Sequence, residues 1–197
     1  DWRTFRVDRV VGKASTGKRF VPRPVPHGDV GKYVARSIAR EVYTYQARVV
    51  LHAPLEQVAE LVNGLSAEQM TTHFIEHEWT VAQNVHHLCD SHMNSYIRCK
   101  LILTEDNPPL KPYDQDVWAA LPDASGADVA ASLGLLAGLH DRWVTFWQNL
   151  PEDAWSRRGL HPENGPVTLE DQLRLYAEHG AGHLRQMGNT LAAQPVD

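Results

Sequence analysis

Residues 80–103, TVAQNVHHLCDSHMNSYIRCKLIL, are the stretch that decides the fold. Thr80, followed three residues later by Gln83, fits a capping box, in which the hydroxyl accepts from a free backbone N–H at the start of a helix. Pro108 and Pro109 prevent the helix from continuing far beyond this stretch. We therefore predict a long helix from Thr80 to about Leu103.

Three further helices are predicted on either side of this one. A shorter helix covers about 55–65, where Gly64 helps to end it, and a longer one covers about 128–150. Thr168 and Asp171 resemble a second capping pair, which opens a last helix that ends at about Leu191. Apolar residues recur at three- and four-residue steps in each: Leu55, Val58, Val62 and Leu65; then Val129, Leu133, Leu136, His140, Trp143, Trp147 and Leu150; then Leu169, Leu173, Tyr176, His183 and Met187. The expected architecture is mainly α, an antiparallel bundle of the four-helix type.

The segment that joins the second and third predicted helices runs from Glu105 to about Gly126. It is rich in proline and aspartate and contains Trp118. A connection of this length is uncommon unless it is packed or functional, so we expect it to be one or the other.

The first fifty residues have a different periodicity. Apolar and polar residues alternate over 2–11 and again over 43–51, which predicts two strands, and a proline-interrupted stretch at 20–26 predicts an extended connector. Charge changes as well: residues 1–50 hold 11 Lys or Arg and 4 Asp or Glu, against 8 and 20 in residues 51–197. We therefore divide the chain into a small β-rich segment, 1–53, and a helical domain, 54–197.

The composition is that of a globular protein, with 43% hydrophobic and 22% charged residues. Apolar runs fall short of the ~20 residues of a membrane helix, and nothing at the start of the sequence resembles a signal peptide, so we expect a cytoplasmic location and no membrane partner. Cys89 and Cys99 stand too far apart on one helix to bridge, and both are expected to be reduced and buried. The negative charge of residues 51–197 argues against nucleic-acid contact there.

Two histidines four residues apart, His179 and His183, share one face of the last predicted helix and can point their ring nitrogens at one ion. A third ligand has to come from a neighbouring helix, where His86 and His87 are about 100° apart, so that normally one of them points inward. Three neutral imidazoles suit zinc or nickel and leave positions for water, as in a catalytic site. Gly180 and Gly182 weaken this helix, and close approach at a site would offset their cost. A lone His-x-x-x-His pair is also frequent without any metal.

Long stretches of the chain resemble the YfiT branch of the DinB-like superfamily of metal-dependent hydrolases, over about residues 55–190. The resemblance is carried by 79–98 (WTVAQNVHHLCDSHMNSYIR), 103–113 (LTEDNPPLKPY), 139–144 (LHDRWV) and 176–183 (YAEHGAGH). It implies the metal ligands His87, His179 and His183, with His86 as the fallback. Glu178 and Gly182 depart from the family's motif, which usually has an aromatic residue and a further histidine there.

The resemblance implies an enzyme that uses one divalent metal to activate water or a low-molecular-weight thiol against a small-molecule substrate. The catalytic groups beyond the metal stay unassigned. Asp90, Asn94 and Arg98 follow along the ligand helix and could orient a ligand or bind a polar substrate, or they could form a solvated helix face. Among the other histidines, His140 is expected to be hydrogen-bonded in the core, whereas surface or loop positions are expected for His73, His77, His92 and His161.

The family's long first helix would occupy residues that here are β-rich. Two explanations remain open: a first helix shortened to start at about Pro54, or a fourth wall supplied from elsewhere, such as by the partner in a homodimer, the assembly we expect. Residues 1–60 resemble the closing part of WYL domains of bacterial transcriptional regulators, although the Trp-Tyr-Leu motif is missing. Arg3, Arg6 and Arg9 could bind a nucleotide-like ligand or be solvated surface charges. The alternative function is thus a ligand-sensing module without catalysis.

Overall fold

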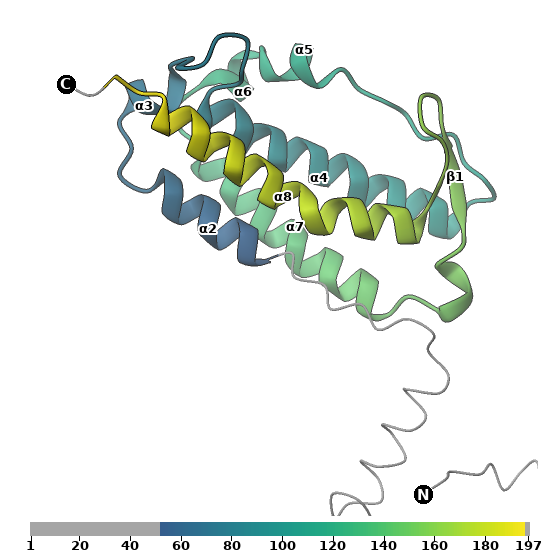
Figure 1. Cartoon of the computed structure of the whole chain (residues 1–197). Coiled ribbons are helices and arrows are strands. Elements are labelled where there is room, and N and C mark those ends of the chain that lie inside the picture. The colour runs from purple at the N-terminus through teal and green to yellow at the C-terminus, as the bar shows by residue number, and fades with distance from the viewer. Residues whose placement is uncertain (1–51, 196–197) are drawn as a thin grey trace, which may run out of the picture. The chain divides into compact units, whose positions relative to one another are not determined.

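The computed structural model describes residues 52–195, and its long elements are helices that lie side by side (Figure 1). They are α2 (His52–Val62), α4 (Val81–Thr104), α7 (Ala130–Gln148) and α8 (Leu169–Ala192). All four predicted helices are confirmed, with ends shifted by a few residues. The predicted β-rich segment, the WYL-like residues before His52 and the three N-terminal arginines lie outside the described residues.

Short elements join these helices. They are α3 (Ala67–Thr71), α5 (Gln115–Ala119), α6 (Pro122–Ser125), the 3-10 turn η3 (Glu152–Ala154) and the antiparallel strands β1 (Arg158–His161) and β2 (Gly165–Thr168). The β1–β2 hairpin was not expected, because the strands are short and their apolar residues do not alternate clearly. β1 packs on the segment after α4, where Leu160 donates to the Pro108 carbonyl at 2.8 Å. A Cβ on Gly159 would come within 2.8 Å of the Leu110 side chain, so this close contact requires glycine.

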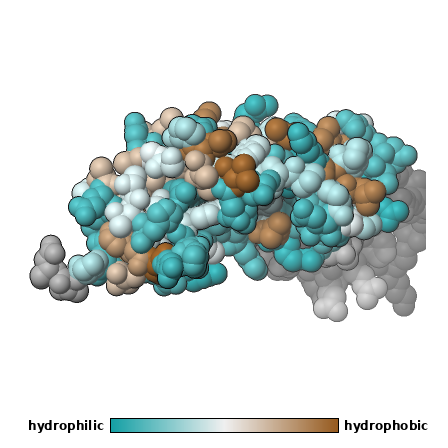
Figure 2. Space-filling view, turned by 90° about the horizontal axis from the view of Figure 1, so that it is seen from above, coloured by the Kyte–Doolittle hydropathy of each residue, from teal (hydrophilic) through white to brown (hydrophobic). Residues whose placement is uncertain are grey.

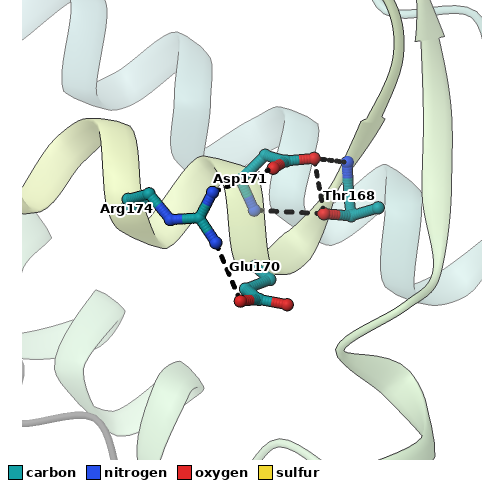
Figure 3. A network of polar contacts seen from close by, with 4 residues as sticks. All are labelled: Thr168, Glu170, Asp171 and Arg174. Atoms are coloured by element: carbon teal, nitrogen blue, oxygen red, sulfur yellow. Dashed lines mark hydrogen bonds and ion pairs between the residues drawn. The ribbon is translucent and has the colours of Figure 1, made fainter.

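Both predicted capping boxes are present. The Thr80 hydroxyl accepts from the backbone N–H of Gln83 at 3.2 Å, and the Gln83 side chain accepts from the Thr80 N–H at 3.0 Å. Thr168 and Asp171 make the same reciprocal pair at the start of α8, where Arg174 also reaches Glu170 at 2.8 Å (Figure 3). These side chains fix the N-terminal ends of α4 and α8, the two helices that carry the candidate metal ligands.

The relative direction of the helices corrects the antiparallel expectation. Pairs of residues in contact ascend together along α4 and α7, as in His86 with Ser132 and His92 with His140, so these two helices are parallel. Along α4 and α8 the pairs run in opposite senses, from His183 with Asn84 to Gln172 with Ser95. The sequence pattern could not distinguish these arrangements, because apolar periodicity marks a buried face without fixing its direction.

The connecting segment explains how α4 and α7 can be parallel. It runs back along α4, since Lys111 accepts a hydrogen bond from Arg98, Ala119 from Gln83 and Gly126 contacts His86. The chain therefore returns to the N-terminal end of α4 before α7 begins. The expectation that this segment is packed rather than slack is confirmed.

The first helix of the bundle is short, as one of the two explanations required. Val58 on α2 is buried with Met70, Leu136 and Met187, so the bundle in the described residues takes its fourth wall from this chain. α2 ends before Gly64, whose φ of +82° suits glycine.

In the described part of the chain, the interior contains two apolar clusters. One surrounds Val81, Val85 and Leu88, and the other surrounds Tyr96, Ile102 and Trp143. Cys89 and Cys99 are free and buried, as predicted. On the face seen in Figure 2, apolar residues lie singly or in small groups among polar ones. Within residues 52–195, no helix combines the length and the apolarity that crossing a membrane requires.

Candidate metal centre

Three histidines from α4 and α8 come together between the helices. His87, His179 and His183 each offer a ring nitrogen within 4.8 Å of those of the other two. The Nε2 atoms of His179 and His183 are 3.2 Å apart, and the ring centroids of His87 and His183 are 4.7 Å apart. The one-turn spacing in α8 and the inward position of His87 on α4 produce this convergence.

Two of the rings are held from behind by hydrogen bonds. Nδ1 of His183 lies 2.8 Å from the Oδ1 of Asn84, whose amide nitrogen donates to the Thr80 carbonyl at 2.9 Å. Nδ1 of His179 lies 3.2 Å from Nε2 of His92. In both rings the nitrogen that faces the cluster is therefore Nε2, and Nδ1 is engaged elsewhere.

Burial keeps these histidines neutral. It lowers the pKa of His87 to about 3, with smaller contributions from the charges of His183 and His179. It also lowers the pKa of His179 to about 4, and His183 adds to this effect. The pKa of His183 is lowered by burial too, while a hydrogen bond to Gln186 raises it. Neutral imidazole is the form that binds a metal, so the cluster is ready to do so near neutral pH.

The donor set fits a divalent transition metal. Two nitrogens that each lie about 2.05 Å from one ion and are 3.2 Å apart subtend about 100° at that ion, close to a tetrahedral angle. The set is all nitrogen and uncharged, which suits zinc, nickel and similar ions better than calcium or magnesium. Three protein ligands also leave room for an exogenous one.

Trp79 and a surface pocket border the cluster. The centroid of the Trp79 ring lies 4.6 Å from that of His87, and the Trp79 ring is nearly parallel to that of His183, with an interplanar angle of 7°. The pocket has a volume of about 210 Å³ and connects His183 to the surface. Its other lining residues are His77, Glu78, Trp79, Gln115, Asp116 and Gln186. A small molecule could approach His183 by this route.

His86, the fallback ligand, points to a different part of the molecule. Its two ring nitrogens contact the Ser132 hydroxyl at 2.8 Å and the Gly126 carbonyl at 3.1 Å. The three-histidine cluster instead contains His87. The two neighbours on α4 thus face different elements, as their separation of about 100° requires.

Asp90, Asn94 and Arg98 lie further along α4 and are half-buried. The amide of Asn94 donates to the Asp90 carbonyl at 2.9 Å, and the Arg98 guanidinium donates to the Lys111 carbonyl at 2.7 Å. Burial, followed by the nearby Asp123, raises the pKa of Asp90. These hydrogen bonds hold Asn94 and Arg98 against α4 and the connecting segment. The suggested role of the three residues in orienting a ligand or binding substrate stays a prediction.

The expectations for the other histidines are confirmed in some cases and wrong in others. His140 is buried and bonded to His92 at 2.8 Å, as predicted, and the exposed positions of His73 and His77 are confirmed. His92 and His161 were expected at the surface or in loops, but both are buried, His92 with 3% of its surface exposed. His92 sits on the inner face of α4, and His161 ends β1, the strand that was not predicted.

The expectation that close approach at the site requires glycine at position 182 is wrong. A Cβ on Gly182 would meet no atom within 4 Å, so close approach does not explain this glycine. Gly180 is buried and lines a small internal cavity with His92 and His140.

Three residues of the site were not singled out from the sequence: Trp79, Asn84 and His92. Asn84 precedes His87 by three positions, and His92 follows Leu88 by four, so helical spacing places them on or beside the buried face. That signal was available for both. Nothing local indicated that Trp79, which precedes the helix, would lie over the ligand rings.

Comparison with known proteins identifies relatives of this chain. The DinB superfamily model matches residues 51–187. The chain is 40% identical over 157 residues to the "Putative metal-dependent hydrolase YfiT" of Bacillus subtilis, covering 79% of this chain and 88% of that protein. It is 43% identical over 123 residues to the similarly named OB0782 of Oceanobacillus iheyensis, covering 62% of this chain and 71% of the relative.

Solved structures show the same fold. The structure of YfiT from Bacillus subtilis, described as an unusual four-helix bundle topology, aligns with a TM-score of 0.68 at 36% identity and covers 74% of this chain and 91% of that one. A mycothiol-dependent maleylpyruvate isomerase aligns with a TM-score of 0.55 at 18% identity, covering 70% and 57%, which shows a shared fold alone. Because the family model matches residues 51–187, more than half of the chain, and a relative covered over 88% of its length is 40% identical, the chain belongs to the DinB superfamily.

Proposed function

We propose that this chain is a metal-dependent hydrolase that holds one divalent ion, zinc or nickel, on His87, His179 and His183. The observation that carries the proposal is the convergence of three neutral imidazoles with two Nε2 atoms 3.2 Å apart. The names of its relatives, which describe metal-dependent hydrolases, support the same reaction class.

An ion held by three neutral imidazoles lowers the pKa of a bound water or thiol and so supplies a nucleophile near neutral pH. The chain's own residues prepare for this. Asn84 and His92 hold the Nδ1 atoms of His183 and His179, so that each Nε2 faces the cluster. Trp79 covers one side of the rings, and the 210 Å³ pocket beside His183 admits a small substrate.

Transfer of a low-molecular-weight thiol is the second candidate. Burial raises the pKa of Cys89 to about 11 and that of Cys99 to about 12, so neither thiol of this chain is a ready nucleophile. Thiol chemistry at this site would therefore use a thiol that enters from solution. The likeness in fold to a mycothiol-dependent isomerase is what favours testing this reaction.

Other expectations stay predictions. The ligand-sensing alternative depends on residues 1–60, most of which lie outside the described residues. The expected homodimer and the expected cytoplasmic location also stay predictions. So does the suggestion that Asp90, Asn94 and Arg98 bind a polar part of the substrate.

The experiment that tests the proposal compares metal-free, zinc-loaded and nickel-loaded protein on a panel of ester, amide and phosphoester substrates. A parallel assay adds a low-molecular-weight thiol and an electrophile. We expect at least one reaction to appear on metal loading and to be lost in His87→Ala, but not in His73→Ala, which changes an exposed histidine. Equal rates in the metal-free and loaded proteins across both assays would contradict the proposal.

A further inference from the structure

A network of hydrogen bonds between buried and half-buried side chains connects two of the proposed metal ligands to residues behind them. It begins at Asn84, passes through His183, His179 and His92, and reaches His140. His92 and His140 are 3% and 2% exposed and line a small cavity with Leu88 and Leu136 of one apolar cluster and Tyr176 of the other. Buried polar groups in such a position need a hydrogen-bonding reason to be there.

At the Asn84 end of this network, the position of the ring proton is fixed. A neutral imidazole has one N–H donor and one bare nitrogen that accepts. The amide nitrogen of Asn84 is used by the Thr80 carbonyl at 2.9 Å, so the Asn84 oxygen faces His183 and accepts from its Nδ1–H at 2.8 Å. His183 therefore has a bare Nε2, whether or not an ion is bound.

Without an ion, the N–H groups of this network can donate in only one direction. The bare Nε2 of His183 accepts from His179 only if His179 carries its proton on Nε2. Nδ1 of His179 is then bare and accepts from Nε2–H of His92. Nδ1 of His92 is bare in turn and accepts from Nε2–H of His140, at 2.8 Å. Each proton thus points from His140 toward Asn84.

An ion requires the opposite direction in three of the rings. To bind metal through Nε2, His179 must carry its proton on Nδ1, which donates to a bare Nε2 of His92. The proton of His92 is then on Nδ1 and donates to Nε2 of His140. The protons of His140 and His92 each move along a hydrogen bond to the next ring, the proton on Nε2 of His179 is released to solvent, and Nδ1 of His140 takes up one proton from solvent in exchange. Each ring keeps one proton, so the charge stays the same, while the N–H of all three rings has moved from Nε2 to Nδ1.

We propose that His92 and His140 form a tautomer relay behind His179, which reverses its direction when the site takes up its ion. The proposal rests on the proposed metal site and adds a positioning role for His92 to it. In the loaded protein His92 gives the Nδ1–H of His179 a buried acceptor, which fixes the ring with Nε2 toward the ion. A partner of this kind typically contributes about 10- to 100-fold to metal affinity.

Long-range proton–nitrogen spectra of protein labelled with ¹⁵N in its histidines report the tautomer of each ring directly. Zinc is the probe, because it is diamagnetic. We expect His92 to change from the Nε2–H to the Nδ1–H tautomer on zinc addition, and His183 to keep its Nδ1–H. If His92 has the same tautomer before and after zinc binding, the relay is wrong although the metal site stands. If the wild-type protein takes up neither zinc nor nickel, both proposals are wrong.

Zinc affinity, measured by competition with a chelator, tests the positioning role. His92→Leu removes the acceptor and is expected to weaken binding about 10- to 100-fold. His92→Gln restores one acceptor and one donor and is expected to recover most of this loss, which a merely space-filling role would not predict. His86→Leu is the matched control, since it replaces a buried histidine of the same helix that bonds to Ser132 and Gly126 instead. Unchanged affinity in His92→Leu, or equal losses in the Leu and Gln variants, would overturn the positioning role.

Discussion

Replacing Asn84 with leucine tests how the site orients His183. The change removes two hydrogen bonds, the 2.8 Å contact with Nδ1 of His183 and the 2.9 Å bond to the Thr80 carbonyl. The Thr80 carbonyl keeps a partner, because the backbone N–H of residue 84 also donates to it at 3.1 Å. The lasting defect is therefore one half-buried imidazole N–H without an acceptor.

An unpaired buried donor costs about 1–3 kcal/mol, so the free energy of unfolding should fall by an amount in that range. Metal affinity should fall by about 10- to 100-fold, which corresponds to about 1.4–2.7 kcal/mol. Urea denaturation of the metal-free protein measures the first quantity, and competition for zinc with a chelator measures the second.

Asn149→Leu is the control for the loss of an amide bond within a helix. Asn149 also donates to the carbonyl four residues earlier, that of Thr145 at 2.8 Å, but it lies at the end of α7 and is exposed. We expect its zinc affinity to equal that of the wild type. If Asn84→Leu binds zinc as tightly as Asn149→Leu does, Asn84 does not orient His183 and the reasoning is refuted.

Three further predictions concern stability. Between about pH 6.5 and pH 4, the metal-free protein should lose about 1.4 kcal/mol of unfolding free energy per pH unit for each histidine that stays neutral only when folded. His87 and His179, with folded pKa values of about 3 and 4 against an ordinary 6.5, are two such groups. As the pH falls, the unfolded protein protonates these histidines first, so this contribution to stability is complete above pH 6.5 and declines below it. Urea denaturation at several pH values should show a shallower decline of the unfolding free energy for His87→Gln than for the wild type. Equal slopes of unfolding free energy against pH in the two proteins would contradict these pKa shifts. Trp143→Ala, at a fully buried position, should cost about 3–5 kcal/mol in a urea titration, whereas Leu135→Ala, at a position 64% exposed, should change stability by less than about 0.5 kcal/mol. Thr80→Ala should cost about 1 kcal/mol by loss of the N-cap, and a variant as stable as the wild type would show that the cap is dispensable.

Local signals in the sequence were enough to find the four long helices, α2, α4, α7 and α8, but not the short helices between them. Capping pairs at Thr80 and Thr168 and apolar spacing along each stretch depend on neighbours within one or two turns, and both are visible without a structure. The parallel order of α4 and α7 was out of reach, because it depends on where the segment from Glu105 to Gly126 travels. Its contacts with α4 are long-range hydrogen bonds, which no local pattern specifies.

The candidate site could be predicted only in part from the sequence, for the same reason. The spacing of His179 and His183 proposes two ligands by itself, and the family resemblance supplied the choice of His87 over His86. His92 was placed wrongly because a histidine inside a mostly polar stretch of helix looks like a surface residue. Its burial depends on His140 from α7, a partner 48 positions away in the chain.

Elemental analysis of purified protein tests the metal centre most directly. Wild-type protein, His87→Ala and His183→Ala are expressed in medium supplied with zinc and nickel, purified without chelator and measured side by side, with circular dichroism to check that each is folded. The account predicts a near-stoichiometric content of zinc or nickel in the wild type and its loss in both variants. Equal metal content in all three folded proteins would contradict it.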